Sequence, residues 1–176
     1  LSALMLLVSA VVTLAVLTYS VGQGMTGDER EAPVSIYHPT FLVLVAGVSN
    51  AFLAGDLFNL FVSFEMLLFA SYVLLTLGGT ETRIRAGTIY VVVNMLSSTL
   101  FLISLAAVYA ATGSLNLAQL AQRIEDLPDP VSLTLQLLLL VTFSVKAAVF
   151  PLSLWLPDSY PTAPAPVTAV FAGLLT

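Results

Sequence analysis

Long apolar runs separated by short polar connections constrain this chain more than any other feature of its sequence. A helix that crosses the hydrocarbon core of a bilayer needs about 20 apolar residues, because each residue rises about 1.5 Å and the core is about 30 Å thick. Five of the runs are long enough, and a sixth is shorter. We predict membrane-spanning helices at about residues 1–20, 36–54, 57–77, 87–111 and 132–155, with an incomplete span at 164–176.

Composition indicates the same class of protein. Hydrophobic residues make up 59% of the chain and charged residues only 9%, against about 25% charged in soluble domains. We therefore predict an all-α integral membrane protein, a polytopic helix bundle with one transmembrane domain over residues 1–176. Because both ends of the chain lie within apolar runs, we expect a fragment of a longer protein with five complete spans and part of a sixth.

The residue counts also exclude several kinds of site. With no cysteine the chain cannot build a disulfide, a thiolate metal site or an iron–sulfur cluster. It contains neither a glycine-rich phosphate loop nor a basic patch, so we expect no cofactor, no bound metal and no nucleic acid as a partner. The single histidine, His38, is interpreted as a solvated loop residue at the membrane interface.

The fifth run carries a lysine, Lys146, in hydrocarbon-like surroundings. A lysine at the centre of a span costs roughly 2.5–3.5 kcal/mol on insertion scales, so such a residue indicates a functional site. Pro151 follows it, and a proline inside a helix clashes with the carbonyl four residues back, here that of Ala147. We predict that the span is broken at Pro151 and that the freed Ala147 carbonyl lies beside the lysine, as in transporters that bind ions at broken helices.

The third run carries an acid, Glu65, about 13 Å deep by helical rise. A carboxylate at that depth must be neutralised by a proton or a cation. Intramembrane acids usually mark ion pathways, and the alternative is a protonated Glu65 that only hydrogen-bonds a neighbouring helix. Asp56, just before this run, is expected to cap its first N–H groups, with ion entry as the alternative.

Polar side chains recur along the fourth run at helical spacing. Its candidate polar path consists of Tyr90, Asn94, Ser97 and Ser98. These residues could line a chain of water molecules, or they could form the small, polar seam by which membrane helices pack, and the sequence leaves both readings open. Farther on, apolar residues at helical spacing between 117 and 127 predict a short amphipathic helix in the membrane interface.

Two stretches resemble a known family. They are FNLFVSFEMLLFASYVLLTL and FSVKAAVFPLSLWLPDSYPTAPAPVTAVFAGLLT. Both resemble the proton-translocating antiporter family shared by complex I membrane subunits and multi-subunit, Mrp-type cation/proton antiporters. The part WLPDSYPTAPAPVTAVFAGLLT is most similar to the D-subunit branch of the Mrp-type complexes.

The resemblance implies an antiporter-like fold of about fourteen helices with two inverted five-helix repeats, and a Glu–Lys pair at the core of a proton path. Glu65 matches the family's glutamate by its FxxFE context, and Lys146 matches the lysine before the broken helix. A further lysine of the family would lie beyond the last residue of this sequence. The implied partners are other subunits of a hetero-oligomeric membrane complex, the lipid bilayer, protons and monovalent cations, in the cell membrane of a prokaryote.

We predict a membrane subunit of a monovalent cation/proton antiporter, a secondary transporter subunit rather than an enzyme, in which Glu65 and Lys146 relay protons near the bilayer midplane. One alternative is a proton-pumping subunit of complex I or a related hydrogenase, which would belong to a redox enzyme. Another is a scaffold subunit that conducts nothing. The scaffold reading predicts that neutralising Lys146 leaves transport intact.

Overall fold

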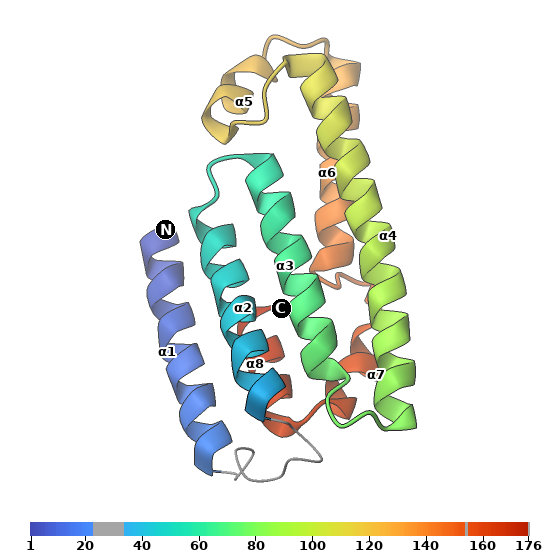
Figure 1. Ribbon diagram of the computed structural model, residues 1–176. Coiled ribbons are helices and arrows are strands. Elements are labelled where there is room, and N and C mark those ends of the chain that lie inside the picture. Colours follow the sequence, from blue (N-terminus) through green and yellow to red (C-terminus); the bar gives the residue numbers. More distant parts are fainter. Residues whose placement is uncertain (23–33, 154, 176) are drawn as a thin grey trace.

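The computed structural model describes residues 1–22, 34–153 and 155–175 of the chain, and these ranges form a bundle of helices (Figure 1). The elements in chain order are α1 (Ser2–Gly22), α2 (Val34–Leu53), α3 (Leu57–Leu75), α4 (Glu81–Thr112), α5 (Leu117–Arg123), α6 (Asp129–Lys146), α7 (Leu156–Ser159), the 3-10 helix η1 (Tyr160–Thr162) and α8 (Ala165–Leu174).

Five helices of the described ranges are long and apolar enough to cross a membrane, namely α1, α2, α3, α4 and α6. This result confirms the predicted all-α membrane bundle. Helix α8 is apolar but has only 10 residues. The polar connection predicted after the first span falls largely on residues 23–33, which lie outside the described ranges.

The long helices run up and down beside one another (Figure 1). Helix α2 packs on α3, α3 on α4, α4 on α6, and α1 on both α2 and α8. Helix α6 accompanies only the upper half of α4, and α7, η1 and α8 occupy the lower part of the bundle. The end of α6 therefore lies near the middle of the bundle, where it faces α3 and α4.

Local capping signals set the boundaries of α3 and α4. Asp56 caps α3, as predicted, by accepting from the backbone N–H groups of Phe58 and Asn59. Thr80 caps α4 in the same way, so α4 begins at Glu81 and the predicted polar connection before residue 87 is mostly helical. Gly113, with φ of 69°, ends α4 in the left-handed conformation that glycine adopts without steric cost.

A short backbone pairing joins two turns at one end of the bundle. The N–H of Leu57 donates to the carbonyl of Leu115 at 2.9 Å, and the N–H of Leu117 donates to that of Gly55 at 3.0 Å. Helix α5 starts directly after this pairing, and it buries Leu120 against the bundle. The predicted short helix is therefore present, and it is attached to the α2–α3 turn.

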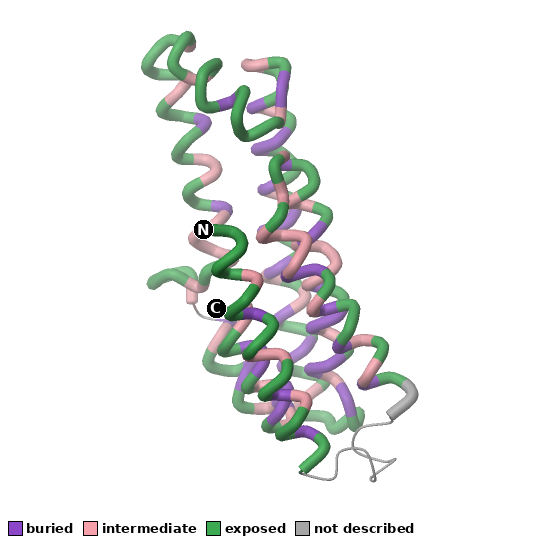
Figure 2. The backbone as a smooth tube through the Cα atoms, turned by 90° about the vertical axis from the view of Figure 1, so that its left-hand side faces the viewer, coloured by how far each residue is buried: buried purple, intermediate pink, exposed green. Residues whose placement is uncertain are grey.

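Buried residues lie on the sides of the helices that face one another, and exposed ones cover the outside (Figure 2). One apolar cluster joins α1, α2, α3 and α8, and a second joins α3, α4, α5 and α6. The outward residues of α1 and α6 are mostly large and apolar, which suits lipid or further protein but not water.

Helix α6 ends at Lys146, before Pro151 is reached. The N–H of Ala148 bonds back to the carbonyl of Val145, and the N–H of Val149 bonds to that of Ser144. Together with φ of 51° at Ala148, these bonds form a Schellman motif, in which a left-handed residue closes the helix. The predicted break in the fifth span is present, but it begins at the lysine, and Pro151 lies in the turns that follow.

His38 is not a loop residue. It lies in the first turns of α2, is half-buried, and its ring centroid is 5.3 Å from that of Tyr37 in an edge-on arrangement. The expectation of a loop was wrong, and it also conflicted with the span predicted at 36–54, which already contains residue 38. The structure agrees with the span, since α2 begins at Val34.

Candidate functional site

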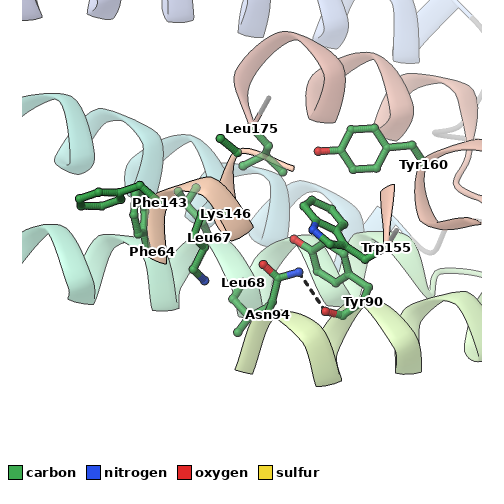
Figure 3. A pocket seen from close by; sticks show the side chains of 11 residues that line it. Phe64, Leu67, Leu68, Tyr90, Asn94, Phe143, Lys146, Trp155, Tyr160 and Leu175 are labelled. Atoms are coloured by element: carbon green, nitrogen blue, oxygen red, sulfur yellow. Dashed lines mark hydrogen bonds between the residues drawn. The ribbon is translucent and has the colours of Figure 1, made fainter. Parts of the chain in front are cut away.

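Lys146, the last residue of α6, lines a cavity of about 250 Å³ in the middle of the bundle (Figure 3). Residues of α3, α4, α6, η1 and the end of the chain form its wall, together with Trp155 from the turn region after the break. The lining residues are Phe64, Leu67, Leu68, Tyr90, Asn94, Phe143, Lys146, Ala147, Trp155, Tyr160 and Leu175. The cavity is mainly apolar and contains one cationic group.

The Lys146 ammonium has two close neighbours. Its Nζ donates a hydrogen bond to Oγ of Ser98 on α4 at 3.1 Å, and it lies 5.8 Å from the centre of the Phe64 ring, within range of a cation–π interaction. As the final residue of α6, the lysine also lies at the negative end of that helix's dipole. These interactions offset part of the cost of keeping a positive charge in an apolar site.

Glu65 lies in the middle of α3, and it is the charged group that interacts electrostatically with Lys146. Its Oε1 atom is buried and has no hydrogen-bond partner. Among the described residues no contact within 4.0 Å joins the Glu65 carboxylate to the Lys146 ammonium. The two groups predicted as a pair are thus neighbours, but the lysine is bound to Ser98 instead.

Trp155 connects the segment that follows the break to the end of α6. Its indole N–H donates to the backbone carbonyl of Val145 at 3.2 Å, and its ring lies edge-on to Tyr90 at 5.4 Å and to Tyr160 at 6.1 Å. The side chain is only 4% exposed. At the break the indole therefore binds the Val145 carbonyl, and Ala147, whose carbonyl is predicted to lie beside the lysine, lines the Lys146 cavity.

The predicted polar path is only partly assembled around the lysine. Tyr90, Asn94, Ser97 and Ser98 are all buried. The Tyr90 hydroxyl shares a 2.6 Å hydrogen bond with Ser71, and Asn94 donates to the Tyr90 carbonyl at 2.9 Å. Tyr90 and Asn94 line the Lys146 cavity, and Ser98 binds the ammonium directly.

Ser97 and Pro151 do not line the Lys146 cavity. Both line a second cavity of about 330 Å³, and Trp155 lies between this cavity and the one that contains Lys146. The Ser97 hydroxyl donates to the backbone carbonyl of Thr142 on α6 at 3.4 Å, so it contributes to helix packing. The structure therefore separates Ser97 and Pro151 from the lysine.

Sequence reasoning missed the aromatic wall of the cavity, which consists of Phe64, Phe143, Trp155 and Tyr160. Phenylalanines in an apolar helix carry no signal that tells a cavity from a lipid-facing side. The single tryptophan of the chain was a usable signal, because a buried indole needs a hydrogen-bond acceptor and a broken helix supplies one. In the described ranges no group of three His, Asp or Glu side chains is placed to hold a metal ion.

The fold and site together define a class of protein, a polytopic membrane bundle with a lysine at the end of a broken helix and an acid on the neighbouring helix. Residues 54–176 match the family described as NADH:quinone oxidoreductase/Mrp antiporter, TM. The chain belongs to this family.

Curated relatives agree with this assignment. The chain is 44% identical over 176 residues to the D subunit of the Na(+)/H(+) antiporter of Bacillus subtilis, an alignment that covers 99% of this chain and 35% of the relative. It is 46% identical over 178 residues to the D subunit of a probable K(+)/H(+) antiporter of Rhizobium meliloti, covering 99% and 32%. The resemblance to D subunits is thus confirmed, and the chain spans about a third of the length of these relatives.

Solved structures give the same fold. A chain of the Mrp complex from Dietzia sp. matches with a TM-score of 0.86 and 37% identity, over 99% of this chain and 32% of that one. A chain of the membrane-bound sulfane sulfur reductase, an archaeal respiratory membrane complex, matches with a TM-score of 0.87 and 32% identity, over 99% and 35%. The predicted antiporter-like fold is confirmed.

Proposed function

We propose that this chain is part of a monovalent cation/proton antiporter subunit in a multi-subunit complex of the cell membrane, and that Lys146 and Glu65 carry its protons. The observation that carries the proposal is the position of Lys146, which ends a membrane helix inside a cavity, with the buried Oε1 atom of Glu65 on α3 nearby. The D-subunit relatives, which are named as parts of Na(+)/H(+) and K(+)/H(+) antiporters, support the same class of transport.

The physical basis of the relay is that two features of the lysine's surroundings have opposite effects on its protonation. A carboxylate near the amine stabilises the charged form, whereas apolar surroundings favour the neutral form. A change in the separation of Glu65 and Lys146 therefore changes how tightly the lysine holds its proton. A conformational change that moves α6 relative to α3 would then load and release one proton.

A second candidate function follows from the match to the respiratory complex, whose TM-score is as high as that of the Mrp complex. In that case the same site would move protons in response to redox chemistry in other subunits. Purification of the full-length protein with its native partners separates the two functions. Partners with flavin or iron–sulfur centres indicate the respiratory type, and small hydrophobic partners without redox centres indicate the antiporter.

The test of the proposed function uses the full-length complex in inverted membrane vesicles. Addition of a cation to vesicles with a preset ΔpH should collapse the ΔpH in the unmodified complex. Lys146→Ala should abolish this collapse while assembly of the complex, checked by blot, is unchanged. Full transport by a normally assembled Lys146→Ala complex would favour the scaffold reading and exclude the relay.

A further inference from the structure

We propose that Ser98 is a positioning residue for Lys146, and that its hydroxyl holds the lysine amine away from Glu65 at one end of the movement that transfers the proton. This inference rests on the proposed function of the Glu65–Lys146 pair. It adds a third residue, on a third helix, to that pair. The site would then have two alternative partners for the same amine, Glu65 on α3 and Ser98 on α4.

The contact between Ser98 and Lys146 joins the middle of α4 to the end of α6. The two residues are 48 positions apart, and their hydrogen bond of 3.1 Å lies inside the bundle, where Ser98 is 7% exposed. Meanwhile the Oε1 atom of Glu65 is buried without a partner. A buried carboxylate oxygen without a hydrogen-bond partner, together with a lysine that is bound to Ser98, fits an arrangement of the proposed relay in which Glu65 and Lys146 are not paired.

A hydroxyl suits this task because of its hydrogen-bonding chemistry. It accepts a hydrogen bond from an ammonium and can rotate to donate one to a neutral amine, whereas an ionised carboxylate can only accept. Ser98 can therefore keep the Lys146 side chain in place before and after the proton leaves. Glu65 attracts mainly the charged form, so the two partners differ in which state of the lysine they favour.

The Ser98 hydroxyl accepts its bond from another helix, and Ser97 and Ser104 on α4 also bond across to α6, at Thr142. By contrast, Thr88 and Thr99 donate to the carbonyls of Ile84 and Met95, four residues back in the same helix. Such bonds satisfy a hydroxyl inside a membrane helix without any outside partner. The bond of Ser98 to another helix is consequently not explained by the needs of α4 alone.

The groups that face Lys146 come from each element around it. Glu65 on α3 is the charged neighbour, and Tyr90 on α4 and Tyr160 on η1 are the titratable groups that line the same cavity. Asn94, also on α4, lines the cavity but donates its amide hydrogen to a backbone carbonyl. Besides these groups, Ser98 on α4 accepts the hydrogen bond that the ammonium donates.

The experiment compares three substitutions of Ser98 in the full-length complex in inverted vesicles. Ser98→Ala removes the hydroxyl and should lower the maximal transport rate about tenfold, the order expected for one lost hydrogen bond to a charged group, with an unchanged half-saturating cation concentration. Ser98→Thr keeps a hydroxyl and should restore most of the rate. Ser98→Cys keeps the size but bonds weakly, so it should be nearly as slow as Ser98→Ala.

The matched control is Ser104→Ala, the same change at a fully buried position of the same helix, which should transport at the unmodified rate. An unmodified rate for Ser98→Ala, with Lys146→Ala inactive, would overturn the role of Ser98 and leave the relay intact. A fast Ser98→Cys would overturn it too, because packing would then matter rather than hydrogen bonding. Full activity of Lys146→Ala would instead remove the proposed function itself.

Discussion

Arg83, in the first turn of α4, donates from Nε to the backbone carbonyl of Thr162 at 3.1 Å, although 79 positions separate the two residues. Nη1 of the same guanidinium donates to the carbonyl of Leu77 at 2.7 Å. One side chain thus ties the α3–α4 turn to the segment that follows the broken helix. This cross-connection ties the start of α4 to η1 (Tyr160–Thr162), whose Tyr160 lines the Lys146 cavity.

Replacing Arg83 by lysine should lower the stability of the complex. The planar guanidinium of arginine reaches two carbonyls at once, whereas the compact ammonium of lysine cannot. At least one hydrogen bond from a charged group is therefore lost. The expected cost is about 1–3 kcal/mol, measured as a lower thermal unfolding midpoint in detergent. Arg85→Lys, at an exposed position of the same helix, is the control and should leave the midpoint unchanged.

Asp56 should act as a helix cap and not as an ion-entry residue. Asp56→Ala removes the acceptor for the N–H groups of Phe58 and Asn59 and should cost about 0.5–2 kcal/mol of stability. Asp56→Asn keeps the cap and removes the charge, so both stability and transport should be preserved. Slow transport by a stable Asp56→Asn complex would instead support ion entry at this position.

Gly87 permits the close approach of α4 to the end of α3. A Cβ at this position would lie 2.6 Å from Cγ2 of Thr76, so Gly87→Ala should destabilise the protein by about 1–3 kcal/mol through overpacking. Thr76→Ser removes that methyl group and keeps the hydroxyl bond to the Tyr72 carbonyl. The double substitution should therefore recover much of the loss. Additive effects of the two changes on the unfolding midpoint would contradict this account.

Replacing Ala148 by glycine should increase the stability of the protein. Its φ of 51° is in the left-handed region, which costs an L-residue roughly 1–2 kcal/mol and costs glycine almost nothing. Part of the gain is lost to the greater freedom of glycine in the unfolded chain, so we expect a net increase of about 0.5–1 kcal/mol. Ala148→Val, with its branched Cβ, should be clearly destabilising. Equal unfolding midpoints for both variants would contradict the Schellman geometry.

Glu65 and Lys146 should behave as one unit in transport. Loss of the acid leaves the lysine without its charged partner, and loss of the lysine leaves the acid without the amine to which it would pass protons. The double substitution Glu65→Ala/Lys146→Ala should then be no slower than Lys146→Ala alone, because residues that act together are strongly non-additive. The rate of cation-driven ΔpH collapse measures this. Independent losses that multiply in the double variant would show that the two residues act separately.

The spans and the cap at Asp56 could be predicted from the sequence because both depend on local signals. Apolar run length decides which segments can cross a bilayer, and an acid directly before a run is a strong cap. The start of α4 lies earlier than predicted because two local signals there disagree. Charged residues suggest a loop, whereas Thr80 already provides a helix cap and Glu81 suits the first turn.

The position of the break could not be read from the sequence. Pro151 is the visible helix breaker, but the helix ends at Lys146 because Ala148 adopts a conformation that usually belongs to glycine. Only tertiary packing can impose that conformation on an alanine. The partner of the lysine was equally hidden, since the bond to Ser98 depends on how α4 and α6 are rotated against each other. The sequence pattern shows which residues share a face of a helix, but it does not show which helix that face contacts.

The backbone pairing of Gly55 and Leu57 with Leu115 and Leu117 has a consequence for the order of synthesis. The α2–α3 turn is synthesised before residues 115–117, so it is first made without the segment with which it pairs. The pairing can form only after α4 has carried the chain back to the same membrane surface. Closure of this pairing therefore requires that α3 and α4 have both crossed the membrane.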